Sequence, residues 1–362
     1  MFYNCSSLKQ ANFPICTSIS YGAFYGCISL TSVNFPNCTI ISGTSAFRNC
    51  TSLTSINFPN CTIIDGHYAF ADCTSLTSIS FPVCTNIGDG AFSGCTSLTS
   101  ISFPVCTTID TYAFNNCSSL VSVNFPACTS IGYNAFANCY SLTSINFPVC
   151  TSIGDYAFSN CTSLTSVYFP KCTRIDNTQF KDCTSLTSID FPACTIIGYS
   201  AFTNFVSLTS INFPACEIIY SWAFKGCTSL TSINFSACTT IYSEVFKGCT
   251  SLTSVNFPAC TAIYSSAFAD CTSLTTANFP VCTYIGTTAF TNCYNLLSLY
   301  LEASTICTLA NSNAFTSTPI AGYTEYTNGV LGSIFVPASL VDAYKAATNW
   351  TYFADRITAI PE

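Results

Sequence analysis

The sequence predicts a solenoid, a stack of coils in which each unit of 22 or 23 residues adds one short strand to a parallel sheet. Three observations support this fold class. Two series of cysteines recur with that spacing along most of the chain, apolar and polar residues alternate after each leucine of the repeat, and only 7% of the 362 residues are charged. A fixed spacing over such a length indicates a repeat architecture rather than separate globular domains.

One unit, residues 98–119, reads L-T-S-I-S-F-P-V-C-T-T-I-D-T-Y-A-F-N-N-C-S-S. Its first six residues fit the L-x-x-L-x-L signature of a leucine-rich repeat. Ile101 and Phe103 alternate with serines, which predicts a short strand with one apolar face. Cys106 is expected to point inward and to hydrogen-bond the backbone of the turn. Four later residues complete the expected interior, with the Ala-Phe pair in a short helical turn on the convex side: Ile109, Ala113, Phe114 and Cys117.

About fourteen such units run from Leu8 to Leu296. A single unit cannot bury its apolar face alone, so the units must stack. Parallel strands about 4.8 Å apart would then form a curved sheet on the order of 65 Å long. Two columns of phenylalanines run through the predicted interior, and burial of each ring contributes roughly 1.5–3 kcal/mol.

The 27 cysteines allow three interpretations. Disulfides would suit a secreted protein, but like cysteines in stacked parallel coils have a geometry poorly suited to an S–S bond. Zinc is disfavoured because the chain has no C-x-x-C motif and a lone histidine, His67. We therefore expect the cysteines to pack as small apolar groups. Phe205, which fills the one gap in the first cysteine series, favours this interpretation.

The repeat resembles the BspA-like, or Treponema-type, branch of the leucine-rich repeats. Residues 139–161, from Cys-Tyr-Ser-Leu to Phe-Ser-Asn-Cys, fit its consensus C-x-S-L-x-S-I-x-(I/F)-P-x-x-x-x-I-G-x-x-A-F-x-x-C. The resemblance covers about four fifths of the chain. It implies a right-handed horseshoe or a gently curved solenoid, a location on bacterial or protozoan surfaces, and roles in adhesion to host proteins and to other cells.

The two ends of the repeat array differ. Residues 1–301 are expected to form the solenoid, and residues 302–362 an irregular last repeat followed by a C-terminal cap. In that cap, a strand is expected at 333–337, and Ser339 is expected to begin a helix that buries Leu340, Ala343, Tyr344 and Ala347. Trp350, Phe353, Ile357 and Ile360 would cover the last coil. The N-terminus begins within a unit and has no visible signal peptide. This predicts a fragment of a longer chain, or end-to-end self-association at an uncapped end.

Composition and motifs argue against several functions. A net charge of -7 without a basic patch disfavours nucleic acid as a partner. No apolar run approaches the roughly 18 residues needed for a membrane span. The chain has a single histidine, expected to be exposed, and this excludes most catalytic sites in which a histidine activates a Ser or Cys nucleophile. No phosphate loop or cofactor motif appears. Aspartates recur near the turn of each unit and before some cysteines, where we expect a solvated edge: Asp65, Asp72, Asp89, Asp110, Asp155, Asp176, Asp182 and Asp270.

Two surfaces are candidates for contact. The exposed strand face is a monotonous ladder of Ser and Asn, which suits weak contacts repeated many times. It departs from the repeat in one candidate contact zone: Tyr168, Lys171, Arg174 and Asp190. The variable flank carries aromatic residues, which are good contact residues but could also simply shield the turn: Tyr199, Tyr220, Trp222, Tyr242 and Tyr264.

These observations favour a non-catalytic adhesion module, at a cell surface or secreted, that binds proteins or glycans. A cytoplasmic location stays open because the cysteines are expected to be reduced. The alternative function is a structural spacer or an assembly subunit, such as a fibre, a surface appendage or a viral tail component. An enzyme is disfavoured, and no cofactor or metal is expected.

Overall fold

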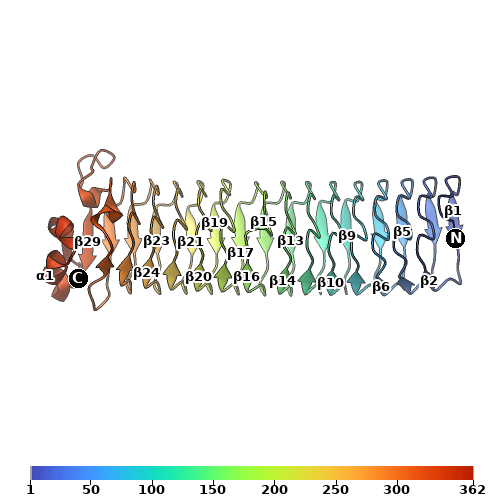
Figure 1. The fold of residues 1–362 in the computed structure, drawn as a ribbon, viewed down its shortest axis with the longest axis horizontal. Helices are drawn as coiled ribbons and strands as arrows, with labels where there is room; N and C mark the ends of the chain where they lie inside the picture. Colours follow the sequence, from blue (N-terminus) through green and yellow to red (C-terminus); the bar gives the residue numbers. More distant parts are fainter. Residues whose placement is uncertain (1, 362) are drawn as a thin grey trace. The chain divides into compact units, whose positions relative to one another are not determined.

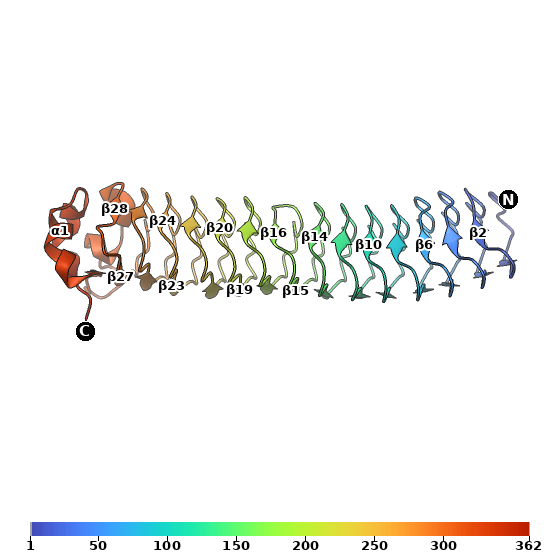
Figure 2. The ribbon, with the colours of Figure 1, turned by 90° about the horizontal axis from the view of Figure 1, so that it is seen from below.

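The computed structural model describes residues 2–361. Its contacts divide them into two units: unit 1 comprises residues 2–172 and 178–186, and unit 2 comprises residues 173–177 and 187–361. Within each unit, successive coils are joined by parallel strands (Figure 1). Every regular coil contributes a three-residue strand and a two-residue strand, and Figure 2 shows these in separate rows. The predicted class, a parallel solenoid of stacked repeats, is confirmed.

Unit 1 contains fifteen strands, in two rows. The three-residue strands are β1 (Gln10–Asn12), β3 (Ser32–Asn34), β5 (Ser55–Asn57), β7 (Ser78–Ser80), β9 (Ser100–Ser102), β11 (Ser122–Asn124), β13 (Ser144–Asn146) and β15 (Ser166–Tyr168). The two-residue strands form one unbroken parallel sheet: β2 (Ser18–Ile19), β4 (Ile40–Ile41), β6 (Ile63–Ile64), β8 (Asn86–Ile87), β10 (Thr108–Ile109), β12 (Ser130–Ile131) and β14 (Ser152–Ile153).

Unit 2 repeats this arrangement. Its three-residue strands are β17 (Ser188–Asp190), β19 (Ser210–Asn212), β21 (Ser232–Asn234), β23 (Ser254–Asn256), β25 (Thr276–Asn278) and β27 (Ser298–Tyr300). Its two-residue strands also form a continuous sheet: β16 (Arg174–Ile175), β18 (Ile196–Ile197), β20 (Ile218–Ile219), β22 (Thr240–Ile241), β24 (Ala262–Ile263), β26 (Tyr284–Ile285) and β28 (Thr308–Leu309).

The strand register keeps like residues in columns. Val123 of β11 lies opposite Ile101 of β9, and the two polar neighbours on each strand are paired in the same way. Ile101 is buried while Ser100 and Ser102 are exposed, which is the alternation that the sequence predicts. The second strand follows the same rule, because Ile109 is buried and pairs with Ile131. Each coil therefore directs one apolar residue inward from each of two sides.

Two interlocked columns of phenylalanine rings fill the interior of both units. Along one column, Phe103 and Phe125 stack with their centroids 5.4 Å apart and their planes 4° apart. Along the other, Phe92 and Phe114 stack at 5.4 Å and 5°. Between the columns, Phe103 meets Phe114 edge to face at 6.1 Å and 63°. Both arrangements are favourable for aromatic pairs, so each ring is held by neighbours above, below and beside it.

The Ala-Phe segment of each coil is not the short helical turn that the sequence suggests. It is a series of hydrogen-bonded turns, in which Tyr112 and Asn116 have positive φ angles of 56° and 59°. A right-handed helix cannot continue through such residues. Instead the backbone amides bond to the next coil, as when the Phe114 N–H donates to the Ala135 carbonyl at 2.8 Å. Only the remnant Asn313-Ala314-Phe315 lies in a helical turn, the 3₁₀ helix η1 (Ser312–Phe315).

A left-handed residue precedes each cysteine of the first series. In every coil this position is Asn, Asp or Gly, the residues that tolerate positive φ best. Asp72, Asp182 and Asp270 belong to this column, so the backbone explains their residue type better than a solvated edge does. The full column, all with φ between 54° and 76°, is Asn4, Gly26, Asn49, Asp72, Gly94, Asn116, Asn138, Asn160, Asp182, Asn204, Gly226, Gly248, Asp270 and Asn292.

The C-terminal elements close the last coil of unit 2. They are η1, η2 (Pro319–Ala321), β29 (Ser333–Val336), η3 (Ala338–Leu340), α1 (Val341–Ala346), η4 (Trp350–Arg356) and β30 (Ile357–Ala359). β29 is the expected last strand and pairs with β27. The Trp350 indole N–H donates to the Cys307 carbonyl at 2.7 Å, and the Cys307 N–H donates to the Tyr344 hydroxyl at 2.8 Å. The cap is therefore fastened to the backbone of the coil it covers.

Two details of the predicted cap are wrong. Ser339 does not cap a helix, because the chain already turns into η3 after Pro337 and α1 begins at Val341 without a side-chain cap. Ala343 is exposed, because six residues make less than two helical turns and bury little more than Tyr344. Trp350, Phe353 and Ile357 are buried as expected, whereas Ile360 is only half-buried.

Candidate functional site

The cysteines form part of the packed interior rather than a chemical site. All 27 are free thiols, of which Cys5 is exposed, Cys16 is half-buried and the others are buried. Cys106 Sγ donates to the Thr108 carbonyl at 3.2 Å, as expected for its column. In the other column, Cys117 Sγ donates to the Phe92 carbonyl of the preceding coil at 3.3 Å. Burial raises the pKa of Cys117 to about 12, so the thiol stays protonated and unreactive.

The charged groups of the predicted solvated edge form local pairs. His67 is exposed, and its Nδ1 lies 3.2 Å from Asp89 Oδ2. Burial raises the pKa of Asp110, and the nearby carboxylates of Asp89 and Asp65 add to this effect. Within residues 2–361, no group of three or more histidine, cysteine or acidic side chains is arranged to hold a metal ion.

On the exposed strand face, polar side chains form hydrogen bonds with the neighbouring coil. In unit 2, Asn234 Nδ2 donates to Asn212 Oδ1 at 2.8 Å, and Asn212 Nδ2 donates to Asp190 Oδ1 at 3.0 Å. The threonines beside the strands act similarly, since Thr231 Oγ1 donates to the Thr209 carbonyl at 3.1 Å. These ladders engage part of the polar strand face within the protein itself.

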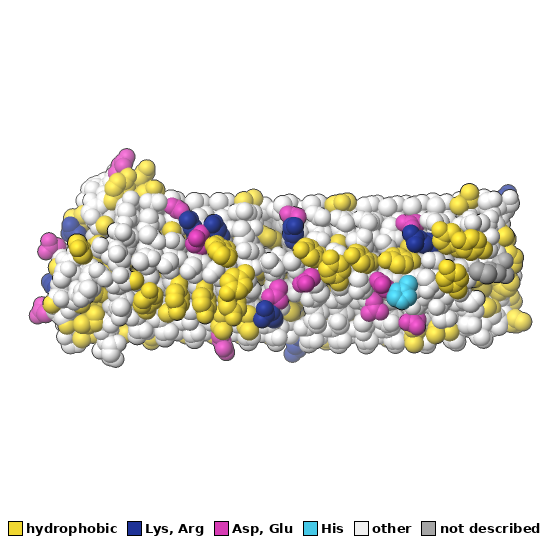
Figure 3. Space-filling model, viewed as in Figure 1, with side chains coloured by type: hydrophobic (Ala, Val, Ile, Leu, Met, Phe, Trp, Pro, Cys, Tyr) yellow, Lys and Arg dark blue, Asp and Glu magenta, His cyan; other side chains and the backbone are white. Residues whose placement is uncertain are grey.

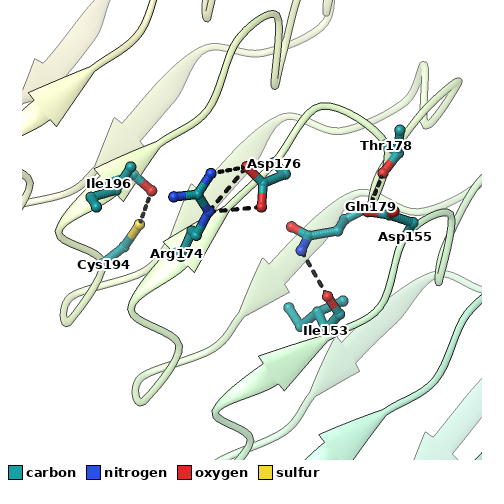
Figure 4. Close-up of polar contacts among 8 residues, drawn as sticks. All are labelled: Ile153, Asp155, Arg174, Asp176, Thr178, Gln179, Cys194 and Ile196. Atoms are coloured by element: carbon teal, nitrogen blue, oxygen red, sulfur yellow. Dashed lines mark hydrogen bonds and ion pairs between the residues drawn. The ribbon is translucent and has the colours of Figure 1, made fainter.

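The candidate contact zone is divided between the two units. Tyr168 and Lys171 belong to unit 1, where both side chains are exposed. Arg174 and Asp190 belong to unit 2. Arg174 forms a forked pair with Asp176, with Nη2 to Oδ1 at 2.8 Å and Nε to Oδ2 at 2.9 Å (Figure 4), which raises the pKa of the guanidinium. Asp190 takes part in the amide ladder described above, so both unit 2 residues are engaged within their own unit.

A buried glutamine in unit 1 was not anticipated from the sequence. Gln179 stands where most other coils have alanine before the second phenylalanine, and it is almost fully buried. Its Nε2 donates to the Ile153 carbonyl at 2.8 Å, and the adjacent Thr178 hydroxyl donates to Asp155 Oδ1 at 2.8 Å (Figure 4). The substitution of Gln for Ala in the N-T-Q-F segment was the available signal. The amide satisfies a buried carbonyl and is therefore structural.

The aromatic flank of unit 2 is the most distinctive surface in the chain. It consists of Tyr199, Tyr220, Trp222, Tyr242 and Tyr264. The tyrosine rings stack from coil to coil, with centroid distances of 4.8 Å for Tyr199–Tyr220, 5.4 Å for Tyr220–Tyr242 and 5.3 Å for Tyr242–Tyr264. Figure 3 shows hydrophobic side chains gathered in a band on this face of the unit. Tyr284 extends the band at 5.7 Å from Tyr264. It was missed because it lies in β26 rather than in the turn.

Trp222 occupies an unfavourable backbone conformation. Its φ angle is 65°, which is costly for a bulky side chain. In unit 1 the same column holds Gly22, Gly90 and Asn134, residues that adopt positive φ readily, but also Tyr68, Tyr112 and Tyr156. The side chain of Trp222 is 41% exposed and lies against Tyr199 at a centroid distance of 6.4 Å. Neither backbone preference nor burial accounts for a tryptophan here.

Charged side chains border Trp222. Lys225 Nζ lies 2.7 Å from Glu244 Oε2, and Lys247 Nζ lies 3.6 Å from the same oxygen. The hydrogen bond from Lys225 is the main cause of a lowered pKa at Glu244, to which Lys247 and Trp222 also contribute. The flank therefore combines exposed aromatic area with an ordered polar border, the usual composition of a protein interface.

Comparison with known proteins identifies the class. The repeated coils, inward cysteines and parallel strands are those of a leucine-rich-repeat solenoid, a class that uses extended surfaces for binding. The family model for the BspA type leucine rich repeat region matches residues 1–121, 85–204 and 195–321. This chain belongs to that family. Comparison with curated protein sequences yields no relative.

Several solved structures are similar. A leucine-rich repeat protein from Bacteroides ovatus is 32% identical, with a TM-score of 0.58, over 83% of this chain and 74% of that one. A leucine rich cell surface protein from Faecalibacterium prausnitzii is 28% identical, with a TM-score of 0.44, over 75% of this chain and 87% of that one.

In the part of the chain that the structure describes, no helix has both the length and the apolar character needed to cross a bilayer.

Proposed function

We propose that this protein is a non-catalytic adhesion module that binds a protein partner through the aromatic flank of unit 2. The observation that carries the proposal is Trp222, an exposed tryptophan kept at a positive φ angle of 65°. A glycine or asparagine there would relieve about 1–2 kcal/mol of backbone strain. Tyr68, Tyr112 and Tyr156 of unit 1 share this conformation, so Trp222 is distinguished by its exposed indole ring beside the stacked tyrosines rather than by strain alone.

The ring geometry favours a protein over a glycan. A sugar stacks on the face of an aromatic ring, but most faces in the ladder are covered by neighbouring tyrosines, as at Tyr242–Tyr264, whose planes are 6° apart. The ring edges and the hydroxyl groups of the tyrosines remain available, as does the exposed ring surface of Trp222, whose indole N–H is directed to Glu244. Tyrosine and tryptophan with a polar border are typical contact residues of protein interfaces.

The proposed roles of the chain segments, the type of partner and the location follow from the family resemblance. We propose that residues 1–301 form the presenting solenoid and residues 302–362 close it. The partner would be extracellular, and this chain would act at a cell surface or as a secreted protein, as the resemblance to BspA-like surface proteins implies. A catalytic role is not proposed, because burial raises the pKa of thiols such as Cys117 and keeps them protonated.

A substitution at Trp222 tests this proposal. Trp222→Asn keeps a residue suited to positive φ, so we expect a melting temperature equal to or above that of the wild type. Binding to immobilised matrix proteins, such as fibronectin, laminin and collagen, is expected to fall at least about tenfold, since hot-spot tryptophans contribute 2 kcal/mol or more. Surface plasmon resonance measures the binding and calorimetry the stability.

The matched control is Tyr352→Asn, which removes an aromatic side chain that is 74% exposed in η4 and should leave binding unchanged. Equal binding by Trp222→Asn and the wild type would refute the proposal, as would the absence of binding to any matrix protein. End-to-end filaments in micrographs without such binding would support the spacer function instead.

A further inference from the structure

A second aromatic cluster lies in unit 2, formed by the loop that precedes β29 and the turn that precedes β27. It comprises Tyr294, Tyr323 and Tyr326, whose ring centroids are 5.0 Å apart for Tyr294–Tyr326, 5.7 Å for Tyr294–Tyr323 and 6.1 Å for Tyr323–Tyr326. Figure 1 shows the segment between η2 and β29 as a loop that projects away from the coils of this unit. The side chain of Tyr326 is 55% exposed. The loop therefore presents aromatic surface outside the regular repeat.

A carboxylate belongs to the same cluster. The Tyr323 hydroxyl donates a hydrogen bond to Glu325 Oε2. This bond raises the pKa of Tyr323 to about 12, so the phenol stays neutral and the carboxylate is the charge of the cluster. Among residues 2–361, Glu325 forms no ion pair. Figure 3 shows acidic and hydrophobic side chains together on this loop.

The residue types at this place are not required by the fold. Tyr294 follows a cysteine of the repeat, at a position that is Thr or Ser in most other coils. Tyr323 and Tyr326 lie in a segment that belongs to no helix or strand and is largely exposed. Three tyrosines beside an unpaired carboxylate form an electronegative surface, because aromatic faces carry negative potential and attract cations.

We propose that Tyr294, Tyr323, Glu325 and Tyr326 form a binding site for a cationic side chain, specifically the guanidinium of an arginine in a partner protein. Glu325 Oε2 is engaged by Tyr323, while Oε1 remains free to accept from an N–H donor. A guanidinium supplies such donors in a planar group that also stacks on an aromatic face. A quaternary ammonium has no N–H to donate and would use the rings alone. This site is separate from the aromatic flank and does not depend on its function.

Titration of the full chain with the blocked tripeptide Gly-Arg-Gly tests the site, with tyrosine resonances followed by NMR. We expect weak binding that perturbs the tyrosines of the loop and weakens with added salt. Glu325→Gln and Tyr326→Leu should each reduce affinity about two- to fivefold, the effect expected for one exposed ion pair or one cation–π contact. Tyr352→Leu, at an exposed tyrosine elsewhere in the unit, should leave the affinity unchanged.

Two comparison probes separate the contribution of the positive charge from that of the N–H donors. The same peptide with citrulline in place of arginine keeps the shape and loses the charge, and it should not bind. Tetramethylammonium should bind more weakly than the arginine peptide. The proposal is overturned by equal binding of the citrulline peptide, by unchanged affinity in both loop variants, or by tetramethylammonium binding as tightly as arginine.

Discussion

Alkaline pH is expected to unfold this protein in a sharp transition above pH 9. Burial raises the pKa of Cys117, Cys128 and Cys150 to about 12, from an ordinary value of 9.0. Below pH 9 the thiols are protonated in both states, and their contribution to stability is fully present. Between pH 9 and 12 the unfolded chain releases these protons while the folded chain retains them, so the free energy of unfolding falls as pH rises.

The size of this effect comes from repetition. Each buried thiol removes about 1.4 kcal/mol of stability per pH unit in this range, so these three alone remove about 4 kcal/mol per unit. A typical domain is stable by only about 5–15 kcal/mol, and further cysteines of both columns have raised pKa values, Cys84 and Cys238 among them. We therefore expect the midpoint of the unfolding transition to lie one to two pH units above pH 9. Circular dichroism measures this transition.

Repulsion between exposed negative charges also grows at alkaline pH and must be separated from the effect of the buried thiols. Added salt is the control, because it screens repulsion between exposed charges but does not relieve the burial of a thiolate. The transition should persist in high salt. A backbone signal that stays native up to pH 12 would contradict the dry placement of the cysteines.

Phe114→Ala is expected to destabilise unit 1 by about 3–5 kcal/mol, the usual result of replacing a buried phenylalanine by alanine. Phe114 is fully buried. Its ring stacks on Phe92 at 5.4 Å and on Phe136 at 5.3 Å, and it meets Phe125 edge to face at 6.0 Å. The cavity cannot collapse easily, because the coils above and below are fixed by backbone hydrogen bonds. Chemical denaturation measures the loss.

The control for Phe114→Ala is Ser100→Ala, on the exposed side of β9. It should change stability by less than about 0.5 kcal/mol. A Phe114→Ala protein as stable as the wild type would mean that the ring columns are not continuous. A loss of structure confined to one part of the chain would still agree with continuous ring columns, because the coils of a repeat protein contact only their neighbours.

The interior could be predicted from the sequence because the repeat averages over many coils. Ile101, Cys106 and Phe114 recur at fixed spacings, and a position that stays apolar through a dozen coils has to face inward. The inward hydrogen bond of Cys106 was predicted for the same reason. Trp350 and Phe353 were predicted in the cap because large apolar residues near the end of a repeat array must cover its core.

Several features could not be predicted because they depend on backbone geometry. The second strand of each coil has two residues, too short for an alternation pattern. The turn around Tyr112 looks helical by composition but is divided by left-handed residues. The Asn, Asp or Gly before each cysteine is a usable signal of positive φ, whereas the sequence-based expectation covers only the aspartates Asp72, Asp182 and Asp270 and attributes them to a solvated edge. The aromatic flank was recognised by composition, whereas the ring stacking and the strain at Trp222 needed coordinates.

The reactivity of the thiols tests the stacked, dry interior most directly. Of the 27 cysteines, Cys5 is exposed and Cys16 is half-buried, while all the others are buried. A thiol-specific reagent added to the reduced, folded protein should modify Cys5 rapidly and Cys16 more slowly, with mass spectrometry as the readout. The remaining cysteines should react only after denaturation. Rapid modification of many cysteines in the folded protein would show that the columns face water and would contradict the account.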